Sequence, residues 1–157
     1  MEILKNVLVV IAVFFTMEFV AWFTHKYVMH GLLWVLHKDH HQKEPGFFEK
    51  NDAFFVIFAV PSITLFITGA HFVNYYLISS GLGILLYGIA YFLVHEVYIH
   101  KRLKWFKNVK NPYLKNLRNA HYNHHKHLGK YDGESFGMLI IDSKYKKKKG
   151  FDIIKSL

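Results

Sequence analysis

The chain contains no cysteine in its 157 residues. Disulfides, iron–sulfur ligation and thiolate zinc sites are therefore excluded, and imidazole and carboxylate remain as the strong side-chain ligands for a metal. Lys and Arg are also absent between Asn51 and Val94, although the chain carries 20 of them. A chain of this length has room for one domain, so we expect residues 1–157 to form a single unit around one site.

The basic residues are concentrated in the C-terminal part of the chain. The net charge is +9, and fifteen of the twenty Lys and Arg lie from His95 onward. This bias is typical of a membrane protein that keeps its basic segments in the cytoplasm, and it argues against nucleic-acid binding. The run KYKKKKG, in a basic tail at about residues 142–157, favours contact with anionic lipids over docking of an acidic electron carrier.

Three apolar stretches come close to the length that crosses a bilayer. They cover about residues 6–24, 53–70 and 72–94. At about 1.5 Å per residue, such helices match a hydrocarbon core of about 30 Å, and they are hard to bury in so short a soluble bundle. We therefore predict an all-α integral membrane protein with three transmembrane helices. Two shorter apolar runs, 31–36 and 136–141, could lie in the interface or cover the site. A fourth span stays an open alternative without support of its own.

The arrangement of these spans predicts which segments share a side of the membrane. The link around His71 is short, so the second and third spans form a hairpin, and Gly81, Gly83 and Gly88 offer places for close helix approach. Residues 26–52 and 95–157 then emerge together on the opposite face. The basic-residue bias places that face in the cytoplasm of the cell's inner membrane, with the N-terminus outside. The first span leads directly into a histidine motif, so we interpret it as retained and not as a signal peptide.

Ten of the twelve histidines form four clusters, in the order HX4H, HX2HH, HX4H, HX2HH. The members of each HX2HH trio share a helix face and can point toward one metal ion. An HX4H pair does not share such a face, but fraying or a local bulge at the end of a span would turn both rings inward. The ten are His25 and His30; His37, His40 and His41; His95 and His100; and His121, His124 and His125.

Each HX4H pair with the trio that follows it gives a half-site of five imidazoles, so the pattern predicts a site for two metal ions on one membrane face. Iron, copper, nickel and zinc all accept imidazole, so the ligand type leaves the metal open. His71 falls on the opposite face and is expected to be a bystander. His127 follows the last trio out of register and has no assigned role.

Three acidic residues are candidates for positions around these ligands. Glu18 is the only ionisable residue well inside a span, seven residues before His25 and on the same helix face. It could accept a hydrogen bond from a ligand histidine, or equally pair with another helix to hold the bundle together. Asp39 and Glu96 adjoin candidate ligands and could orient them or simply lie at the interface.

From about Glu18 to Leu139 the sequence resembles the bacterial carotenoid hydroxylases, the beta-carotene 3-hydroxylases of the histidine-motif fatty acid hydroxylase superfamily. The histidine pattern alone reaches only the superfamily, and the tight spacing between His30 and His37 in a short chain favours the carotenoid branch. Glu96 stands where Asp is more usual. The segments that carry the resemblance are EFVAWFTHKYVMHG, WVLHKDHH, YFLVHEVYIH, LRNAHYNHH and SFGMLI.

The resemblance implies hydroxylation at carbon 3 of beta-ionone rings, which converts beta-carotene through beta-cryptoxanthin into zeaxanthin. It also implies two irons, dioxygen, electrons from a ferredoxin-type or reductase partner, and a carotenoid drawn from the membrane lipids. The ten motif histidines would be iron ligands or lie directly beside them. Aromatic residues of the spans could line a slot for the polyene, although packing is the better interpretation of each; they include Trp22, Phe23, Tyr87, Tyr91 and Phe92.

Other functions on the same scaffold remain open at the level of sequence. They are another lipid hydroxylase, a desaturase and a carotenoid ketolase, because these differ in pocket shape more than in histidine pattern. A membrane metal transporter is the alternative from a different class. Transporters usually place their ligands near the bilayer midplane, whereas these histidines gather just outside one face.

Overall fold

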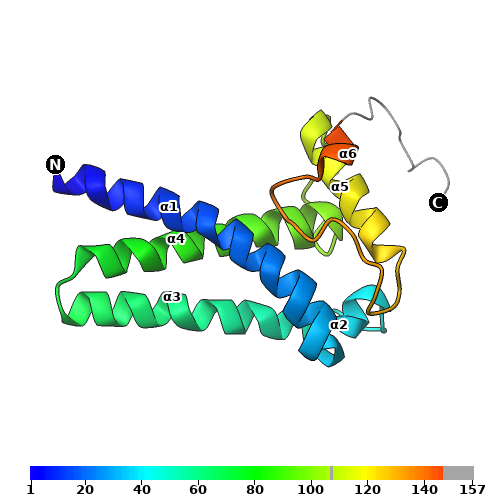
Figure 1. Ribbon diagram of the computed structural model, residues 1–157, viewed down its shortest axis with the longest axis horizontal. Helices are drawn as coiled ribbons and strands as arrows, with labels where there is room; N and C mark the ends of the chain where they lie inside the picture. Colours follow the sequence, from blue (N-terminus) through cyan, green and yellow to red (C-terminus); the bar gives the residue numbers. More distant parts are fainter. Residues whose placement is uncertain (107, 147–157) are drawn as a thin grey trace.

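The computed structural model describes residues 1–106 and 108–146, and over these residues it contains helices and loops without a strand. Three long helices run side by side, and the shorter helices gather at one end of them (Figure 1). The long ones are α1 (Glu2–Phe23), α3 (Ala53–His71) and α4 (Tyr75–Tyr91). The others are η1 (Thr24–Leu32), α2 (Trp34–His41), η2 (Lys50–Asp52), η3 (Phe92–Ile99), α5 (Pro112–His125) and α6 (Ser143–Lys146).

The three predicted spans are confirmed as helices long and apolar enough to cross a membrane. With their extensions they cover Glu2–Leu32, Lys50–His71 and Tyr75–Ile99. The third begins three residues later than predicted because Asn74 caps it, accepting hydrogen bonds from the backbone N–H groups of Tyr76 and Leu77. Within the described ranges there is no fourth helix of this kind. Most of the predicted basic tail, residues 147–157, lies outside the described residues.

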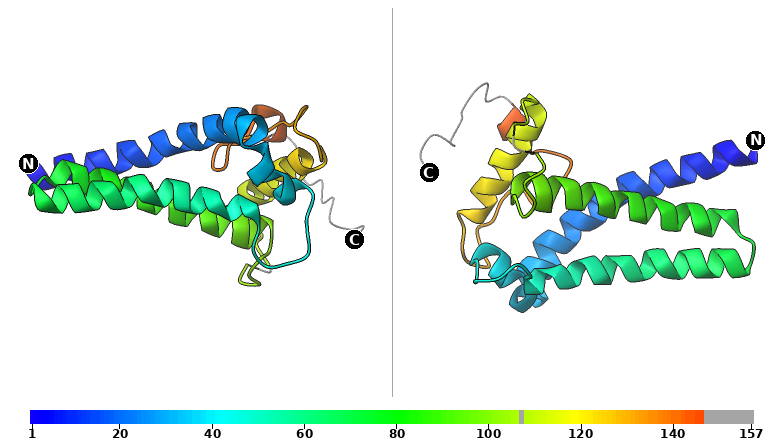
Figure 2. Two further views of the ribbon diagram at one scale, coloured as in Figure 1. Left: turned by 90° about the horizontal axis from the view of Figure 1, so that it is seen from below. Right: turned by 180° about the vertical axis from the view of Figure 1, so that it is seen from behind.

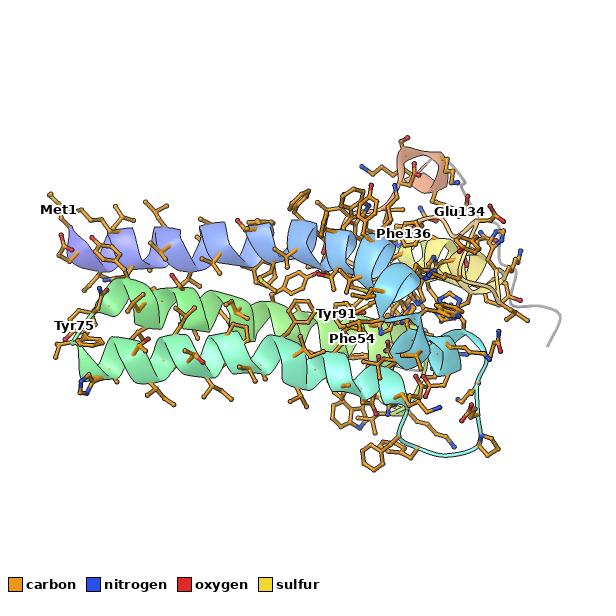
Figure 3. All side chains as sticks on the ribbon, turned by 60° about the horizontal axis from the view of Figure 1, so that its bottom comes forward. Met1, Phe54, Tyr75, Tyr91, Glu134 and Phe136 are labelled. Carbon is orange, nitrogen blue, oxygen red and sulfur yellow. The ribbon has the colours of Figure 1, made fainter. Side chains whose placement is uncertain are left out.

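The outer faces of these helices are apolar and open. Phe15 on α1 is 65 % exposed, and Ile67 on α3 is 64 % exposed. Figure 3 shows such side chains projecting along the whole length of the bundle. Large apolar side chains in this density mark a surface that lipid would cover.

The α3–α4 hairpin is tight at its turn and open at its other end. A Cβ added at Gly69 would lie 2.9 Å from the backbone nitrogen of Ile78, and one at Gly81 would lie 3.0 Å from the carbonyl of Ser62. From the turn the two helices diverge toward the histidine-bearing end (Figures 1 and 2). Glycine therefore permits close approach of α3 and α4 at Gly69 and Gly81.

The three glycines expected to allow close approach behave differently. Gly81 faces α3, and Gly83 faces α1, where an added Cβ would lie 2.9 Å from the carbonyl of Val10. These two expectations are confirmed. The expectation for Gly88 is wrong, because a Cβ there would meet nothing within 4 Å: by Gly88 the neighbouring helices have already separated.

The segments that bear the histidine clusters meet at one end of the bundle, as predicted. α2, α5 and the loop that follows α5 gather beyond the ends of α1 and α4, away from the hairpin turn (Figure 2). Leu117 and Ala120 of α5 pack with Ile141 and Tyr145 in a buried apolar cluster that also contacts Val94 and Ile99. This cluster fixes α5 against the end of the third span.

Candidate metal centre

Two π-helical segments explain how the HX4H pairs turn inward. At the end of the first span the backbone N–H of Leu33 donates to the carbonyl of Val28 at 2.8 Å. At the end of the third span the backbone N–H of His100 donates to the carbonyl of His95 at 2.9 Å. Both bonds join residues five apart, the spacing of an HX4H pair, and such bonds define a π-helix. The expected local bulge is therefore confirmed, and it brings residues five apart onto one face.

The structure brings all ten predicted histidines together in two sets of five. We call them the first group and the second group, and within each the candidate ligand nitrogens lie within 4.8 Å of one another. The first group is His25, His30, His37, His41 and His124. The second group is His40, His95, His100, His121 and His125.

This grouping differs from the expected one, in which each pair joins only the trio that follows it. In each trio the outer two members, four residues apart, stay together, while the middle one crosses to the other group. His40 joins the second group and His124 joins the first. The reason is geometric: residues i and i+4 lie nearly above one another on a helix, and residue i+3 points to the other side of that line. The two groups adjoin, since the rings of His41 and His125 stack with centroids 4.4 Å apart.

Every ring in the first group is held by a hydrogen bond from its Nδ1 to an uncharged oxygen. Four of these acceptors are backbone carbonyls and one is the side-chain amide of Asn51. His25, His30, His41 and His124 donate to the backbone carbonyls of Phe136 (3.0 Å), Lys130 (3.0 Å), His127 (2.9 Å) and Glu134 (2.8 Å), respectively. His37 donates to Oδ1 of Asn51 at 2.7 Å. An imidazole that donates from Nδ1 carries its lone pair on Nε2.

These Nε2 atoms point at one another. The Nε2 atoms of His25 and His37 are 3.1 Å apart, and so are those of His30 and His124. Two unprotonated nitrogens at this distance cannot hydrogen-bond, and their lone pairs repel unless a cation lies among them. The donor set thus fits a bound metal ion, for which neutral imidazole nitrogen is a common ligand.

The second group has the same convergence of Nε2 atoms but different support. His40 donates from Nδ1 to Glu49 at 2.8 Å, and His95 donates to Glu96 at 2.6 Å. Glu96 is fully buried and also accepts from Arg102 at 2.8 Å. Nε2 of His121 lies within 3.1 Å of the Nε2 atoms of His95, His100 and His125. Two of the five rings are therefore held by carboxylates, in contrast to none in the first group.

Burial keeps the imidazoles outside the spans neutral. It is the main cause that lowers the pKa of His37 to about 3, that of His41 to about 4 and that of His124 to about 2, and neighbouring imidazoles lower these pKa values further. At neutral pH these rings hold no extra proton, so their Nε2 lone pairs are available to a metal ion.

Of the two expected roles for Glu18, the structure shows the one that pairs it with another helix; within the described residues it makes no hydrogen bond to a histidine. Its Oε2 accepts from the Tyr87 hydroxyl at 2.7 Å, and its Oε1 accepts the backbone N–H groups of Met138, Leu139 and Ile140 at 2.8 to 2.9 Å. The carboxylate therefore ties residues 138–140 to α1 and α4. The ring of Phe136, just before them, lies 5.0 to 5.3 Å from three rings of the first group. The run 136–141 covers the site, one of its two expected positions.

Of the other two acidic candidates, one has an expected role and the other does not. Glu96 orients His95, as the hydrogen bond above shows. Asp39 instead accepts the backbone N–H of Lys50 at 2.5 Å and so ties η2 to α2. His71 lies at the hairpin turn, away from both groups, and His127 contributes its carbonyl to His41 but no ring to either group.

Several supporting residues were missed by sequence reasoning. Glu49, Asn51 and Arg102 contact candidate ligand histidines or their partners, and the carbonyl acceptors follow α5 in the loop 127–136. Backbone carbonyls leave no mark in a sequence. Glu49 and Asp52 do carry a signal, because they form a reciprocal capping box at the start of the second span.

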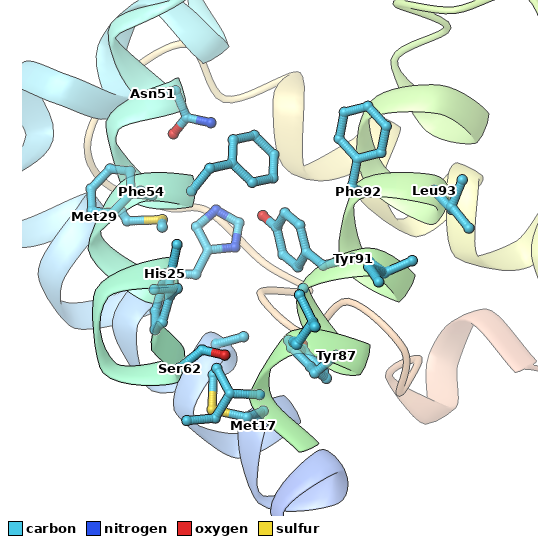
Figure 4. Close-up of a pocket in the computed structure, with 18 of the residues that line it drawn as sticks. Met17, His25, Met29, Asn51, Phe54, Ser62, Tyr87, Tyr91, Phe92 and Leu93 are labelled. Carbon is cyan, nitrogen blue, oxygen red and sulfur yellow. The ribbon is translucent and has the colours of Figure 1, made fainter. Parts of the chain in front are cut away.

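An apolar cavity of about 410 Å³ lies between α1, α3 and α4 beside the first group. His25 enters it from the α1 side, with Phe54, Tyr87 and Tyr91 among its other walls (Figure 4). Of the aromatic residues singled out in the sequence, Tyr87, Tyr91 and Phe92 line this cavity. Trp22 and Phe23 do not.

The membrane-embedded helical bundle with histidine clusters at one end is consistent with the histidine-motif hydroxylase fold. Residues 10–143 match the fatty acid hydroxylase family, and the chain belongs to it.

The chain is also similar to several curated enzymes. It is 41 % identical over 136 residues to a beta-carotene hydroxylase of Pseudescherichia vulneris (87 % of this chain, 77 % of that protein). It is 40 % identical over 134 residues to one of Pantoea ananas (85 % and 76 %). A chloroplastic beta-carotene 3-hydroxylase of Haematococcus lacustris is 38 % identical over 144 residues, 88 % of this chain and 44 % of that protein. No solved structure matches the chain.

Proposed function

We propose that the protein is a beta-carotene 3-hydroxylase, a non-haem di-iron monooxygenase that adds a hydroxyl group at carbon 3 of beta-ionone rings to give beta-cryptoxanthin and zeaxanthin. The observation that carries the proposal is the pair of five-histidine groups beside an apolar cavity within the spans. The similarity to bacterial beta-carotene hydroxylases over most of the chain supports the substrate.

Each histidine group would hold one iron through its Nε2 atoms. Iron suits the reaction better than zinc because zinc has no redox chemistry. Bound iron would supply the activation of dioxygen, with electrons from a ferredoxin-type or reductase partner.

The residues of the chain set the conditions for this chemistry. The Nδ1 hydrogen bonds fix the five rings of the first group, and His40 and His95 of the second, with the lone pair directed inward. Glu49 and Glu96 also add negative charge beside the second group. The run 136–141, docked on Glu18, covers the first group and limits access of water. The apolar cavity would hold the ring of the substrate next to His25, so that the reacting carbon faces the first group.

The protein would lie in the inner membrane with its histidine-bearing end in the cytoplasm. The concentration of Lys and Arg from His95 onward supports this orientation. A cytoplasmic site would also be accessible to a soluble electron donor, and the basic charge around it suits an acidic one.

Expression in bacteria that accumulate beta-carotene tests the proposal. We expect beta-cryptoxanthin and zeaxanthin to appear, identified by chromatography and mass, and to disappear with His124→Ala while the protein stays in the membrane. Supplying a ferredoxin and its reductase excludes a missing donor. Unchanged beta-carotene under those conditions would contradict the proposal and direct attention to fatty acyl or sterol substrates. Accumulation of zinc or iron by cells without carotenoids would favour a transporter.

A further inference from the structure

The cavity beside the first histidine group opens toward the lipid. Ala59 and Ile63 of α3, and Leu85 and Ile89 of α4, line it and are also exposed on the outer surface of the bundle. Ile63 is 55 % exposed and Ile89 is 48 % exposed. A residue that both lines a cavity and faces lipid lies at its mouth. The cavity therefore has a side entrance between α3 and α4, and His25 lies in its wall on the α1 side.

Three polar residues of the cavity wall, Ser62, Tyr87 and Asn51, already have partners within the protein. The Ser62 hydroxyl donates to the carbonyl of Gly81 at 2.8 Å, and the Tyr87 hydroxyl donates to Glu18 at 2.7 Å. The Asn51 side-chain oxygen accepts from His37. These three groups offer a ligand little, and most of the other lining residues are apolar, so the cavity selects mainly for apolar shape.

The size of the cavity limits what can enter it. About 410 Å³ lies within the range of small-molecule sites, which is about 300 to 1,000 Å³. This space accepts a substituted cyclohexene ring and the first part of an attached chain, but it cannot enclose a long polyene. The remainder would stay in the lipid beyond the entrance.

Gly88 is the residue whose lack of a side chain keeps this space open. It lies seven residues after Gly81, two helical turns along almost the same face of α4. At Gly81 a Cβ would press on the backbone of α3, whereas at Gly88 it would meet no atom within 4 Å, and Gly88 lines the cavity. Packing thus requires glycine at position 81 but not at position 88. A larger side chain at 88 would occupy the cavity without displacing the backbone.

We propose that this cavity is the binding slot for the ring end of the substrate, entered sideways from the lipid between α3 and α4, and that Gly88 sets its width. The identity of the ring as a beta-ionone ring rests on the proposed function. The slot itself rests on the cavity, its exposed mouth and the open space at Gly88.

A size series at position 88 tests this slot. Wild type, Gly88→Ala and Gly88→Leu would be prepared in lipid nanodiscs with their metal and compared in three measurements: metal content per chain, beta-carotene bound at equilibrium by its absorbance, and kcat/KM for hydroxylation with a ferredoxin system. Leu86→Phe is the matched control, because Leu86 lies two residues away on α4, is 40 % exposed and does not line the cavity. Replacing glycine inside a helix improves helix propensity, so a loss of function would not come from a weakened helix.

We expect Gly88→Leu to lower both binding and kcat/KM at least tenfold, Gly88→Ala to lower them several-fold, and Leu86→Phe to change them less than twofold, all with wild-type metal content. If Gly88→Leu fails to insert with its metal, the reduction in Gly88→Ala decides. Wild-type binding and turnover in the metal-loaded Gly88 variants would overturn the slot and leave the proposed function intact. If wild type binds beta-carotene, loses that binding in the Gly88 variants and does not hydroxylate it, the slot is upheld and the proposed function is overturned. Neither binding nor hydroxylation by wild type would overturn both.

Discussion

The two histidine groups have the same number of imidazoles but different surroundings. In the first group every Nδ1 donates to an uncharged oxygen, four of them backbone carbonyls. In the second, Glu49 and Glu96 accept from two of the rings, and Nδ1 of His121 has no hydrogen-bond partner in the described part of the chain. A carboxylate makes an imidazole a more basic ligand than a carbonyl does. The two ions are therefore expected to be unequal, with the second held more strongly by charge.

The largest effect should come from removing one ligand from each group. His124→Ala removes a candidate ligand of the first group, and His40→Ala removes one of the second. Each of these residues is the middle member of a trio whose other two histidines belong to the opposite group. Both variants should lose hydroxylation, because both centres are needed. Metal analysis of the purified proteins should show the loss of one ion of two. Adding His25→Ala to His124→Ala should remove no further ion, because both residues belong to the first group. Adding His25→Ala to His40→Ala should remove the second ion as well. The reverse pattern would show that the groups are not crossed.

Glu96→Gln should reduce the difference between the groups. It keeps the size of the side chain but removes the charge that His95 and Arg102 both contact. Loss of such a partner typically costs about 10- to 100-fold in metal affinity or activity. Competition with a chelator should show that the second ion is released more readily while the first is unaffected. Equal weakening of both ions would mean that the carboxylate does not act through its own group.

Glu18→Gln should weaken the cover over the first group. The buried carboxylate accepts three backbone N–H groups and one hydroxyl. Each hydrogen bond to a charged group contributes about 1.5 to 3 kcal/mol, so the loss of stability should be on the order of 3 kcal/mol even if some bonds remain. Thermal unfolding and limited proteolysis after Lys130 would measure it. Tyr87→Phe, which removes a single bond, should have a smaller effect; equal effects would contradict the assigned role.

Metal-free protein should lose stability as the pH falls below the ordinary histidine value of about 6.5. The pKa values of His37 and His41 are lowered to about 3 and about 4 in the folded protein, so below pH 6.5 the unfolded chain binds more protons than the folded one. By linkage, the free energy of unfolding therefore decreases as the pH is lowered, until these rings are protonated in the folded protein as well. Denaturant unfolding of the metal-free protein between pH 7.5 and 4.5 would measure this. A flat profile would mean that the rings are accessible to water.

The smallest effect is expected at the two histidines outside both groups. His71→Ala changes a ring at the hairpin turn, and His127→Ala leaves the carbonyl that His41 contacts. Metal content and turnover should both stay within about twofold of wild type. A loss of metal in either variant would show that the groups are larger than five.

The periodic features of the chain were predictable, and the contacts between distant segments were not. The span lengths, the hairpin and the HX4H bulges follow from hydrophobic runs and residue spacing. The crossing of His40 and His124 depends on how two helices face each other, which spacing along one helix does not specify. Glu18 was identified as an ionisable residue inside a span, but three of its four partners are backbone N–H groups 120 to 122 residues away. The sequence does not distinguish Gly88 from Gly81 and Gly83. Only the divergence of α3 and α4 in the fold gives Gly88 a different role.

The most direct test of the account is the position of the metal in the purified, iron-loaded protein. Anomalous scattering recorded at the iron edge would locate each ion without reference to activity. We predict two iron peaks, one among the Nε2 atoms of the first group, with His124 beside His25 and His30, and one among those of the second group, with His40 beside His95 and His100. A single peak, or His124 bound to the same ion as His121 and His125, would contradict the crossed two-iron site.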